Sequence, residues 1–119
     1  MPVVTLCCLA PDDPDDIDAA LRAIVAAVAE AIGGDQSGTW AHWTPMAAVV
    51  QGERTLGFAA HCPIVTIRGR DRSDPSAVPG ALRAAAAAVS AALSVPLEDV
   101  WVQWVEVEPG RAFAGGDVI

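Results

Sequence analysis

The chain repeats its own sequence after sixty-one residues. With that shift and no gap, PVVTL near the N-terminus aligns with PIVTI, ALRA with ALRA, and WAHW with WVQW. Fifteen of the forty-five aligned positions are identical. Because self-similarity at one fixed period indicates a structural unit used twice, we expect residues 1–119 to form a single domain built from two repeats, 2–46 and 63–107.

The first repeat predicts a strand, a helix and a second strand. Its opening residues, PVVTLCCL, are apolar on both faces, which favours a strand covered by a helix on one side and by something else on the other. Asp13 as a cap and Pro14 in the first turn start a helix, which Gly33-Gly34 stop. Between these signals apolar residues recur at helical spacing, namely Ile17, Leu21, Ile24, Val28 and Ile32. TWAHWTPM is then the second strand.

The second repeat predicts the same order of elements. PIVTIRG is a strand, and the helix begins near Ser76, since Pro79 is tolerated only in a first turn. Pro96 breaks the chain before DVWVQWVEV returns as a strand. Two right-handed βαβ units give an α/β (α+β) fold, a four-stranded mixed sheet with two helices on one face. The other face and the sheet edges stay uncovered, so an oligomer is expected.

The composition excludes several classes of protein. The net charge of −8 argues against a nucleic-acid partner, and no apolar run approaches the about 18 residues of a membrane span. No basic leader precedes the first strand. The three cysteines, two of them adjacent, suit reduced thiols in a cytoplasmic protein. His61 and Cys62, together with Cys7, Cys8 and His42, lack the paired spacing of zinc ligands, so a metal is not expected. No cofactor is expected either.

The positive charges are few and uneven. The chain has no lysine, and three of its seven arginines lie in RGRDR as Arg68, Arg70 and Arg72. A guanidinium matches a carboxylate bidentately, so this cluster predicts a site for a small anion; the alternative is a solvated strand end. The first repeat has no charge at the matching positions, which are Cys7, Leu9 and Pro11. That asymmetry favours one specialised site.

Pro2 directly precedes the first strand, where proline is tolerated, and it has two interpretations. In one it only starts the strand. In the other, removal of Met1 frees its secondary amine, which in a lysine-free chain is the sole amine active near neutral pH. Nearby arginines and an apolar wall would lower the pKa of this amine. Neutral, it takes a proton alpha to a carbonyl; charged, it acts as a general acid. Pro63, its repeat mate, has no free amine, so one site per subunit is expected.

These features together resemble the tautomerase superfamily. The resemblance covers nearly the whole chain: a proline after the initiator, two βαβ units of about sixty residues, and RSD between a strand and a helix. The tail VPLEDVWVQWVEVEPGRAFAGG is similar to that of 4-oxalocrotonate tautomerase, with its final hairpin, and a second hairpin connects the repeats. The resemblance implies a homotrimer whose Pro2 tautomerises a small 2-oxo acid.

Within that superfamily the arginines resemble those of malonate semialdehyde decarboxylase. Arg70, Arg72 and Ser73 match its Arg-x-Arg-Ser pattern, which implies that the arginines bind the substrate carboxylate. Asp35 stands four residues before Thr39, like the catalytic aspartate of that enzyme; as a residue after two glycines it is otherwise a turn residue. This likeness implies an alternative reaction, decarboxylation of a 3-oxo acid or hydration of an unsaturated acid.

The remaining candidates are aromatic or amide side chains. By resemblance to macrophage migration inhibitory factor, Trp101 and Gln103 line the pocket of a neighbouring subunit. Phe113 either caps the pocket or anchors the C-terminal turn. The four tryptophans alternate along two strands, so we expect half of them in the core and half on the other face. If Met1 is retained, the nitrogen of Pro2 is an amide, and a non-enzymatic trimeric binding module is the alternative.

Overall fold

The computed structural model describes residues 2–57, 60–72 and 74–119, so the expectations for Met1 and for Ser73 lie outside the described residues. The main sheet contains β1 (Val3–Leu9), β2 (Trp40–Met46), β5 (Ile64–Gly69) and β6 (Trp101–Glu106). The helices are α1 (Asp15–Ala31) and α2 (Ala77–Leu93), with short 3-10 turns η1 (Gln36–Gly38) and η3 (Leu97–Asp99). Two small hairpins are β3 (Val49–Gln51) with β4 (Arg54–Leu56) and β7 (Phe113–Ala114) with β8 (Asp117–Val118).

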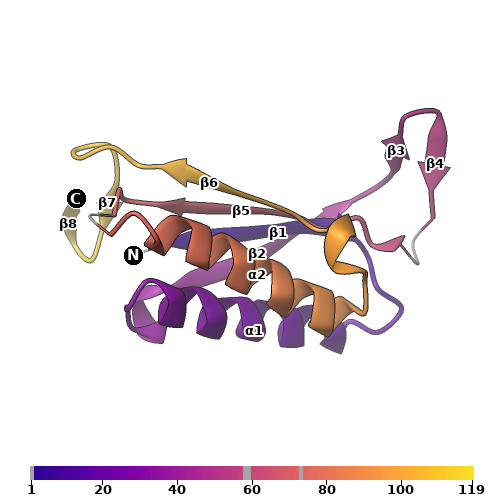
Figure 1. Ribbon diagram of the computed structural model, residues 1–119, viewed down its shortest axis with the longest axis horizontal. Coiled ribbons are helices and arrows are strands. Elements are labelled where there is room, and N and C mark those ends of the chain that lie inside the picture. Colours follow the sequence, from indigo (N-terminus) through magenta and orange to yellow (C-terminus); the bar gives the residue numbers. More distant parts are fainter. Residues whose placement is uncertain (1, 58–59, 73) are drawn as a thin grey trace.

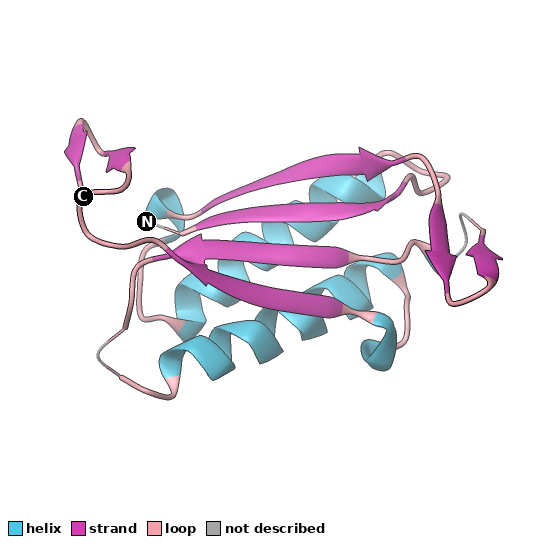
Figure 2. Ribbon diagram, turned by 90° about the horizontal axis from the view of Figure 1, so that it is seen from above, coloured by secondary structure: helices cyan, strands magenta, loops and turns pink. Residues whose placement is uncertain are grey.

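The sheet has the strand order β2-β1-β5-β6. β1 pairs with β2 in parallel and β5 with β6 in parallel, whereas the two central strands, β1 and β5, are antiparallel. Both helices lie on one face of the sheet (Figures 1 and 2). The predicted fold class is therefore confirmed: two βαβ units share one four-stranded mixed sheet.

The helices begin in the same way in both units. The Asp13 carboxylate accepts the backbone N–H of Asp15 at 2.9 Å, and the Asp74 carboxylate accepts that of Ser76 at the same distance. These hydrogen bonds satisfy N–H groups that the first helical turn leaves free. The pKa of Asp74 lies below its ordinary value because the backbone N–H and the hydroxyl of Ser76 both donate to its carboxylate.

The helices end differently. α1 stops as predicted, with Gly33 in the left-handed region at φ +69°. α2 ends at Leu93 because Ser94 adopts φ 54°, so the helix stops before it reaches Pro96.

The core lies between the sheet and the two helices. Val4, Leu6 and Cys8 alternate along β1 toward the helices and are fully buried. Alanines at the helix interface, among them Ala20, Ala81 and Ala85, are also fully buried, which lets α1 and α2 pack closely. Trp43 and Trp104 pack against this core, whereas Trp40 and Trp101 are 63% and 62% exposed. The expected division of the tryptophans is confirmed.

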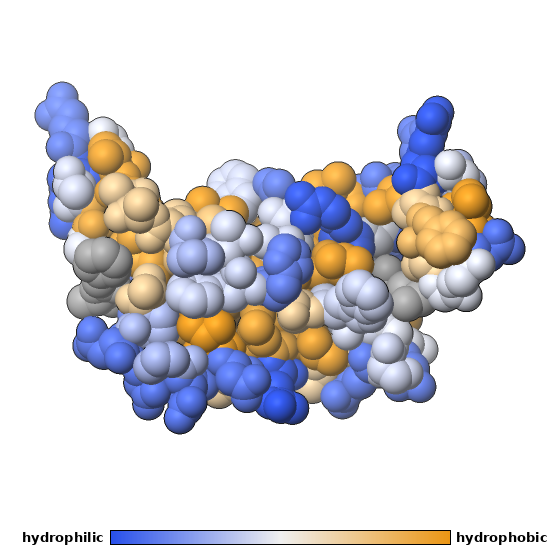
Figure 3. Space-filling model, turned by 180° about the vertical axis from the view of Figure 1, so that it is seen from behind, coloured by the Kyte–Doolittle hydropathy of each residue, from blue (hydrophilic) through white to orange (hydrophobic). Residues whose placement is uncertain are grey.

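The other face of the sheet is open; the β3–β4 hairpin rises above it at one end, and the turn that leads from β6 to β7 stands above it at the other (Figure 1). The surface dips between these raised ends (Figure 3). From the register and the alternation of side chains, the open face carries three rows: Trp40, Val3, Arg68 and Val105; His42, Thr5, Thr66 and Gln103; Thr44, Cys7, Ile64 and Trp101. Neither helix in the described ranges is both long enough and apolar enough to span a bilayer.

Candidate functional site

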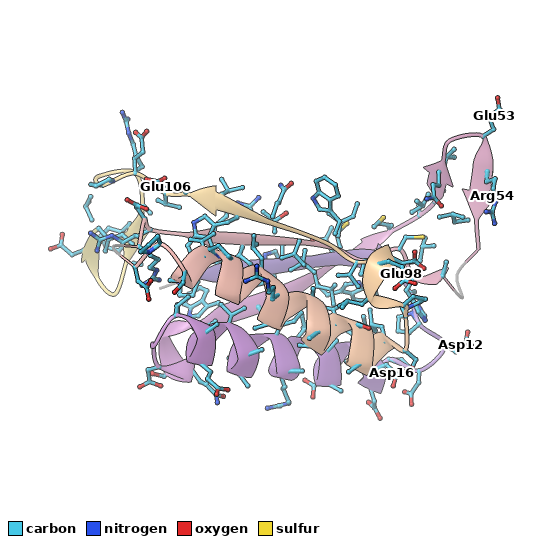
Figure 4. The ribbon with its side chains drawn as sticks, in the orientation of Figure 1. Asp12, Asp16, Glu53, Arg54, Glu98 and Glu106 are labelled. Carbon is cyan, nitrogen blue, oxygen red and sulfur yellow. The ribbon has the colours of Figure 1, made fainter. Side chains whose placement is uncertain are left out.

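The antiparallel pairing of β1 with β5 gives the sheet two distinct ends. At the Pro2 end, β1 and β2 begin while β5 and β6 finish; at the Pro63 end, the directions are reversed. Figure 4 shows Glu106 and Glu98 near these two ends of β6. The β7–β8 hairpin lies at the Pro2 end and the β3–β4 hairpin at the Pro63 end (Figure 1).

The two prolines occupy equivalent places at these ends. The carbonyl of Pro2 accepts the N–H of Trp40 at 3.0 Å, and the carbonyl of Pro63 accepts the N–H of Trp101 at 3.1 Å. Both prolines are buried. Because Val3 pairs with Arg68, the next rung of the ladder sets Pro2 level with Gly69. Pro2 therefore stands beside the strand that leads directly into Arg70.

The three clustered arginines have different surroundings. Arg68 lies on the open face, where its guanidinium donates to the Thr5 hydroxyl at 3.2 Å, and that hydroxyl also bonds His42 Nε2 at 2.8 Å. Arg70 comes directly after the last residue of β5 and is exposed. Arg72 is half-buried, with its guanidinium carbon 6.0 Å from the centre of the Trp104 ring.

The Arg72 side chain rests on an arrangement that the sequence interpretation missed. A Cβ placed on Gly69 would lie 2.6 Å from Cζ2 of Trp104, so the indole lies directly against the glycine backbone. Arg72 Nε is buried without a hydrogen-bond partner among the described residues, and the neighbouring carboxylate of Asp71 accepts only the backbone N–H of Arg72, at 2.9 Å. The repeat alignment did contain a signal for this contact: Gly69 stands where the first repeat has Cys8, so the second repeat lacks a side chain at this position of its strand.

Asp35 lies on the approach to the Pro2 end. Its carboxylate accepts the N–H of Ser37 at 3.0 Å and so caps the η1 turn, while the side chain remains exposed. Thr39 comes after η1, is buried, and stands one residue before the pairing of Trp40 with Val3. The geometry of Asp35 is that of a turn residue close to the strand that flanks Pro2.

Trp101 and Gln103 lie away from Pro2 within one chain. The indole N–H of Trp101 donates to the Gln103 side-chain oxygen at 3.1 Å, and Trp101 pairs with Ile64 at the start of β5. Five residue steps along β5 separate that rung from the level of Pro2, which corresponds to about 17 Å. Phe113 is at the Pro2 end, on the C-terminal hairpin, and is 71% exposed. Trp101 can therefore contribute to a Pro2 site only from another chain.

A cavity of about 600 Å³ lies at the Pro63 end, away from the predicted chemistry. The β3–β4 hairpin, η3 and the start of β6 line it, and its lining includes Cys62, Arg54, Glu98 and Trp101. Figure 4 labels two of these residues, Arg54 on the hairpin and Glu98 on η3. Burial, and to a lesser extent the charge of Asp99, raises the pKa of the Cys62 thiol, so the thiol is kept protonated. None of the described residues that line the cavity has a free amine, so the cavity is not the site of the proline chemistry predicted from the sequence.

Comparisons with known proteins bear on the fold. No protein-family model matches the sequence, and no curated protein matches it in sequence. Among solved structures, native fused 4-OT has a TM-score of 0.85 at 15% identity, covering 98% of this chain and 94% of that one. Macrophage migration inhibitory factor from Toxoplasma gondii has a TM-score of 0.75 at 20% identity, covering 98% and 99%.

A third match is malonate semialdehyde decarboxylase, with a TM-score of 0.75 at 18% identity, covering 95% of this chain and 90% of that one. At such identities a structural likeness defines the fold and leaves the substrate open. The order of strands, the two helices on one face and these near-complete alignments together identify the architecture: the chain has the tautomerase-superfamily fold.

Proposed function

We propose that the chain is a small-molecule enzyme in which the amine of Pro2, freed by removal of Met1, acts as a general base or acid on a small 2-oxo or 3-oxo carboxylic acid. The observation that carries this proposal is the register, which sets Pro2 level with Gly69, immediately before Arg70. A titratable amine next to guanidinium groups suits a substrate that carries both a carboxylate and an acidic C–H bond.

Tautomerisation is the reaction that requires least of this site. The neutral amine takes the proton of an enol hydroxyl, the carbonyl double bond forms, and the former C=C carbon receives a proton from the protonated amine. Arg70 and Arg72 bind the carboxylate and stabilise the negative charge that develops on oxygen. No metal or cofactor takes part in this proposal.

A second candidate is decarboxylation of a 3-oxo acid, or hydration of an unsaturated acid, and the place of Asp35 favours it. In decarboxylation the bond to the carboxylate carbon breaks, CO₂ leaves, and the electron pair forms an enolate that the charged amine stabilises. Asp35 would orient the substrate or water from the η1 turn, which leads to Thr39 beside Pro2.

We further propose that three chains assemble with their sheets facing inward. Trp40 and Trp101 expose large apolar side chains on the open face, and β2 and β6 are unpaired edges in the described sheet. Fused 4-OT proteins with this fold are described as trimers. A neighbouring chain would supply Trp101 and Gln103 as a wall of the Pro2 site, with Phe113 over its mouth. Light scattering at micromolar concentration should give a trimer, and a monomer would contradict the assembly.

The function is tested by the pH dependence of turnover. Native protein without a tag, first shown by intact mass to have lost Met1, is assayed with the enol of phenylpyruvate and with malonate semialdehyde over about pH 5 to 9. A tautomerase gains activity as the amine deprotonates, whereas a decarboxylase or hydratase loses it.

Two variants accompany this assay. Pro2→Ala should lose turnover of every substrate, and Asp35→Asn should lose only the decarboxylase or hydratase reaction. If Pro2→Ala matches native protein on all substrates, or if Met1 is retained, the amine plays no part and the chain is a binding module.

A further inference from the structure

We infer that Trp104 is a positioning residue: its indole, seated against Gly69, holds the Arg72 guanidinium in a fixed place at the Pro2 end of the sheet. The inference rests on the proposed function only in its last step, where the guanidinium meets a carboxylate. Its first steps concern contacts within the chain.

The first step is that Gly69 makes room for the indole. A side chain at this position would place Cβ 2.6 Å and 2.8 Å from Cζ2 and Cη2 of Trp104, closer than real atoms approach. Gly69 is paired with Glu106 in the regular ladder, and its φ does not lie in the region that favours glycine. Its lack of a side chain is therefore explained by the close approach of the ring rather than by the backbone conformation.

The second step is that the ring lies near Pro2. Trp104 packs against the core, so it projects from the face of the sheet that the helices cover. Pro2 precedes the buried Val4 by two residues and therefore projects from the same face. Since Pro2 is level with Gly69 on the adjacent strand, and the indole covers Gly69, proline and indole are neighbours at one end of the sheet.

The third step is that the indole is the contact that orients Arg72. The guanidinium carbon lies 6.0 Å from the ring centre, within reach of a cation–π interaction. The buried Nε of Arg72 has no hydrogen-bond partner in the described residues, and Asp71 accepts only a backbone N–H. With no carboxylate of the described residues binding its head, Arg72 keeps its two terminal nitrogens available for the carboxylate of a ligand.

The first repeat provides an internal control, because it contains the tryptophan without the rest of the arrangement. Trp43 occupies the position of Trp104, but Cys8 stands where Gly69 stands and Pro11 where Arg72 stands. Trp43 is likewise packed against the core. Loss of Trp43 therefore measures what a core tryptophan contributes when no arginine depends on it.

The contact is tested by NMR on the full-length protein labelled with ¹⁵N-arginine, the Arg72 signal being assigned from Arg72→Lys. Because Nε is buried, its proton should exchange slowly, and because it lies near an indole face, its resonance should be shifted by the ring current. Trp104→Leu should remove both properties, Trp104→Phe should retain part of the shift, and Trp43→Leu should change neither. Should Trp104→Leu fail to fold, Trp104→Phe and Gly69→Ala carry the test. An Arg72 signal that is unchanged in these variants overturns the inference.

The role in binding is tested by calorimetry with pyruvate as the probe. Trp104→Leu should weaken binding about fivefold, as expected for the loss of one partly buried cation–π contact, and Trp104→Phe should restore most of it. In an Arg72→Ala background Trp104→Leu should cause no further loss. An equal loss with and without Arg72 shows that Trp104 acts by another route and overturns its positioning role in binding. If native protein binds no 2-oxo acid, the proposed function fails, while the NMR result still decides whether Trp104 holds Arg72.

Discussion

The two ends of the sheet have the same backbone arrangement but carry different side chains. Pro2 and Pro63 accept equivalent hydrogen bonds, at 3.0 Å and 3.1 Å, from the strands beside them. The segments after the central strands differ, since β5 leads to Arg70 and Arg72, whereas β1 leads to Ala10 and Pro11. Starting a strand is a role of proline common to both ends. The arginines that follow β5 distinguish the Pro2 end, and under the proposed function a free amine of Pro2 would add to this difference.

The largest expected difference is between Pro2→Ala and Pro63→Ala. Pro2→Ala should lower kcat/KM by about 10² to 10⁴, the usual contribution of a general acid or base. Pro63→Ala should leave kcat/KM within about twofold and lower the free energy of unfolding by about 1 kcal/mol, chiefly by loosening the unfolded chain. Steady-state kinetics and urea unfolding of both variants check this. Equal kinetic losses would remove the distinction between the ends.

The next effect concerns charge. Arg70→Ala should weaken binding of a small 2-oxo acid by about 10- to 100-fold, the size of one or two lost charge-assisted hydrogen bonds. Arg22→Ala is the control: its exposed ion pair with Asp18, at 2.8 Å on the surface of α1, should contribute little. Calorimetric titration of both variants measures the difference. Equal effects from both would rule out the carboxylate assignment.

Replacing Gly69 or Gly80 by alanine should change the free energy of unfolding in opposite directions. Gly69→Ala forces Cβ against the Trp104 ring and should lower the free energy of unfolding by about 1 to 3 kcal/mol. Gly80→Ala, in α2, meets no atom within 4 Å and copies the Ala19 of the first repeat. It should raise the free energy of unfolding by about 0.5 to 1 kcal/mol. Denaturant unfolding of the pair decides, and a stabilised Gly69→Ala would show that the ring is free to move away.

The smallest effect lies at the Pro63 end, where Cys62 directly precedes the proline. Burial and the Asp99 charge raise the pKa of this thiol, so at a given pH less of it is the reactive thiolate. Asp99→Asn lowers that pKa and should speed alkylation of Cys62 about twofold near pH 8, the scale of one partly screened charge. Limited iodoacetamide labelling, followed by peptide mass spectrometry, measures the rate. A slower reaction in the variant would show that Asp99 acts in the opposite sense.

Much of the fold was predictable because it depends on local periodicity. The strands, the helices and their single shared face follow from apolar spacing and from the repeat, and these predictions are confirmed. The end of α2 was less accessible, since Ser94 takes a left-handed conformation that glycine usually supplies.

The candidate site was only partly predictable for a physical reason. Alternation along a strand gives the face on which Trp104 lies, but not the tilt that brings its ring over Gly69. That tilt depends on packing between β5 and β6, which no local pattern encodes. The cavity beside Cys62 likewise depends on where the β3–β4 hairpin stands relative to the sheet. The role of Asp35 and the contacts of Arg70 with a ligand stay predictions.

The pairing of Thr5 with Thr66 has a consequence for anyone who redesigns this chain. These two residues are repeat mates, and along β1 and β5 this is the rung at which a position faces its own counterpart. A substitution at Thr5 or Thr66 changes one member of a directly paired set of repeat-equivalent residues, so the same substitution is needed at both positions to keep the pair identical. Other residues of β1 and β5 do not pair with their repeat equivalents, because each equivalent lies toward the opposite end of the sheet. One end of the molecule can thus be rebuilt for a new ligand while the other is left untouched.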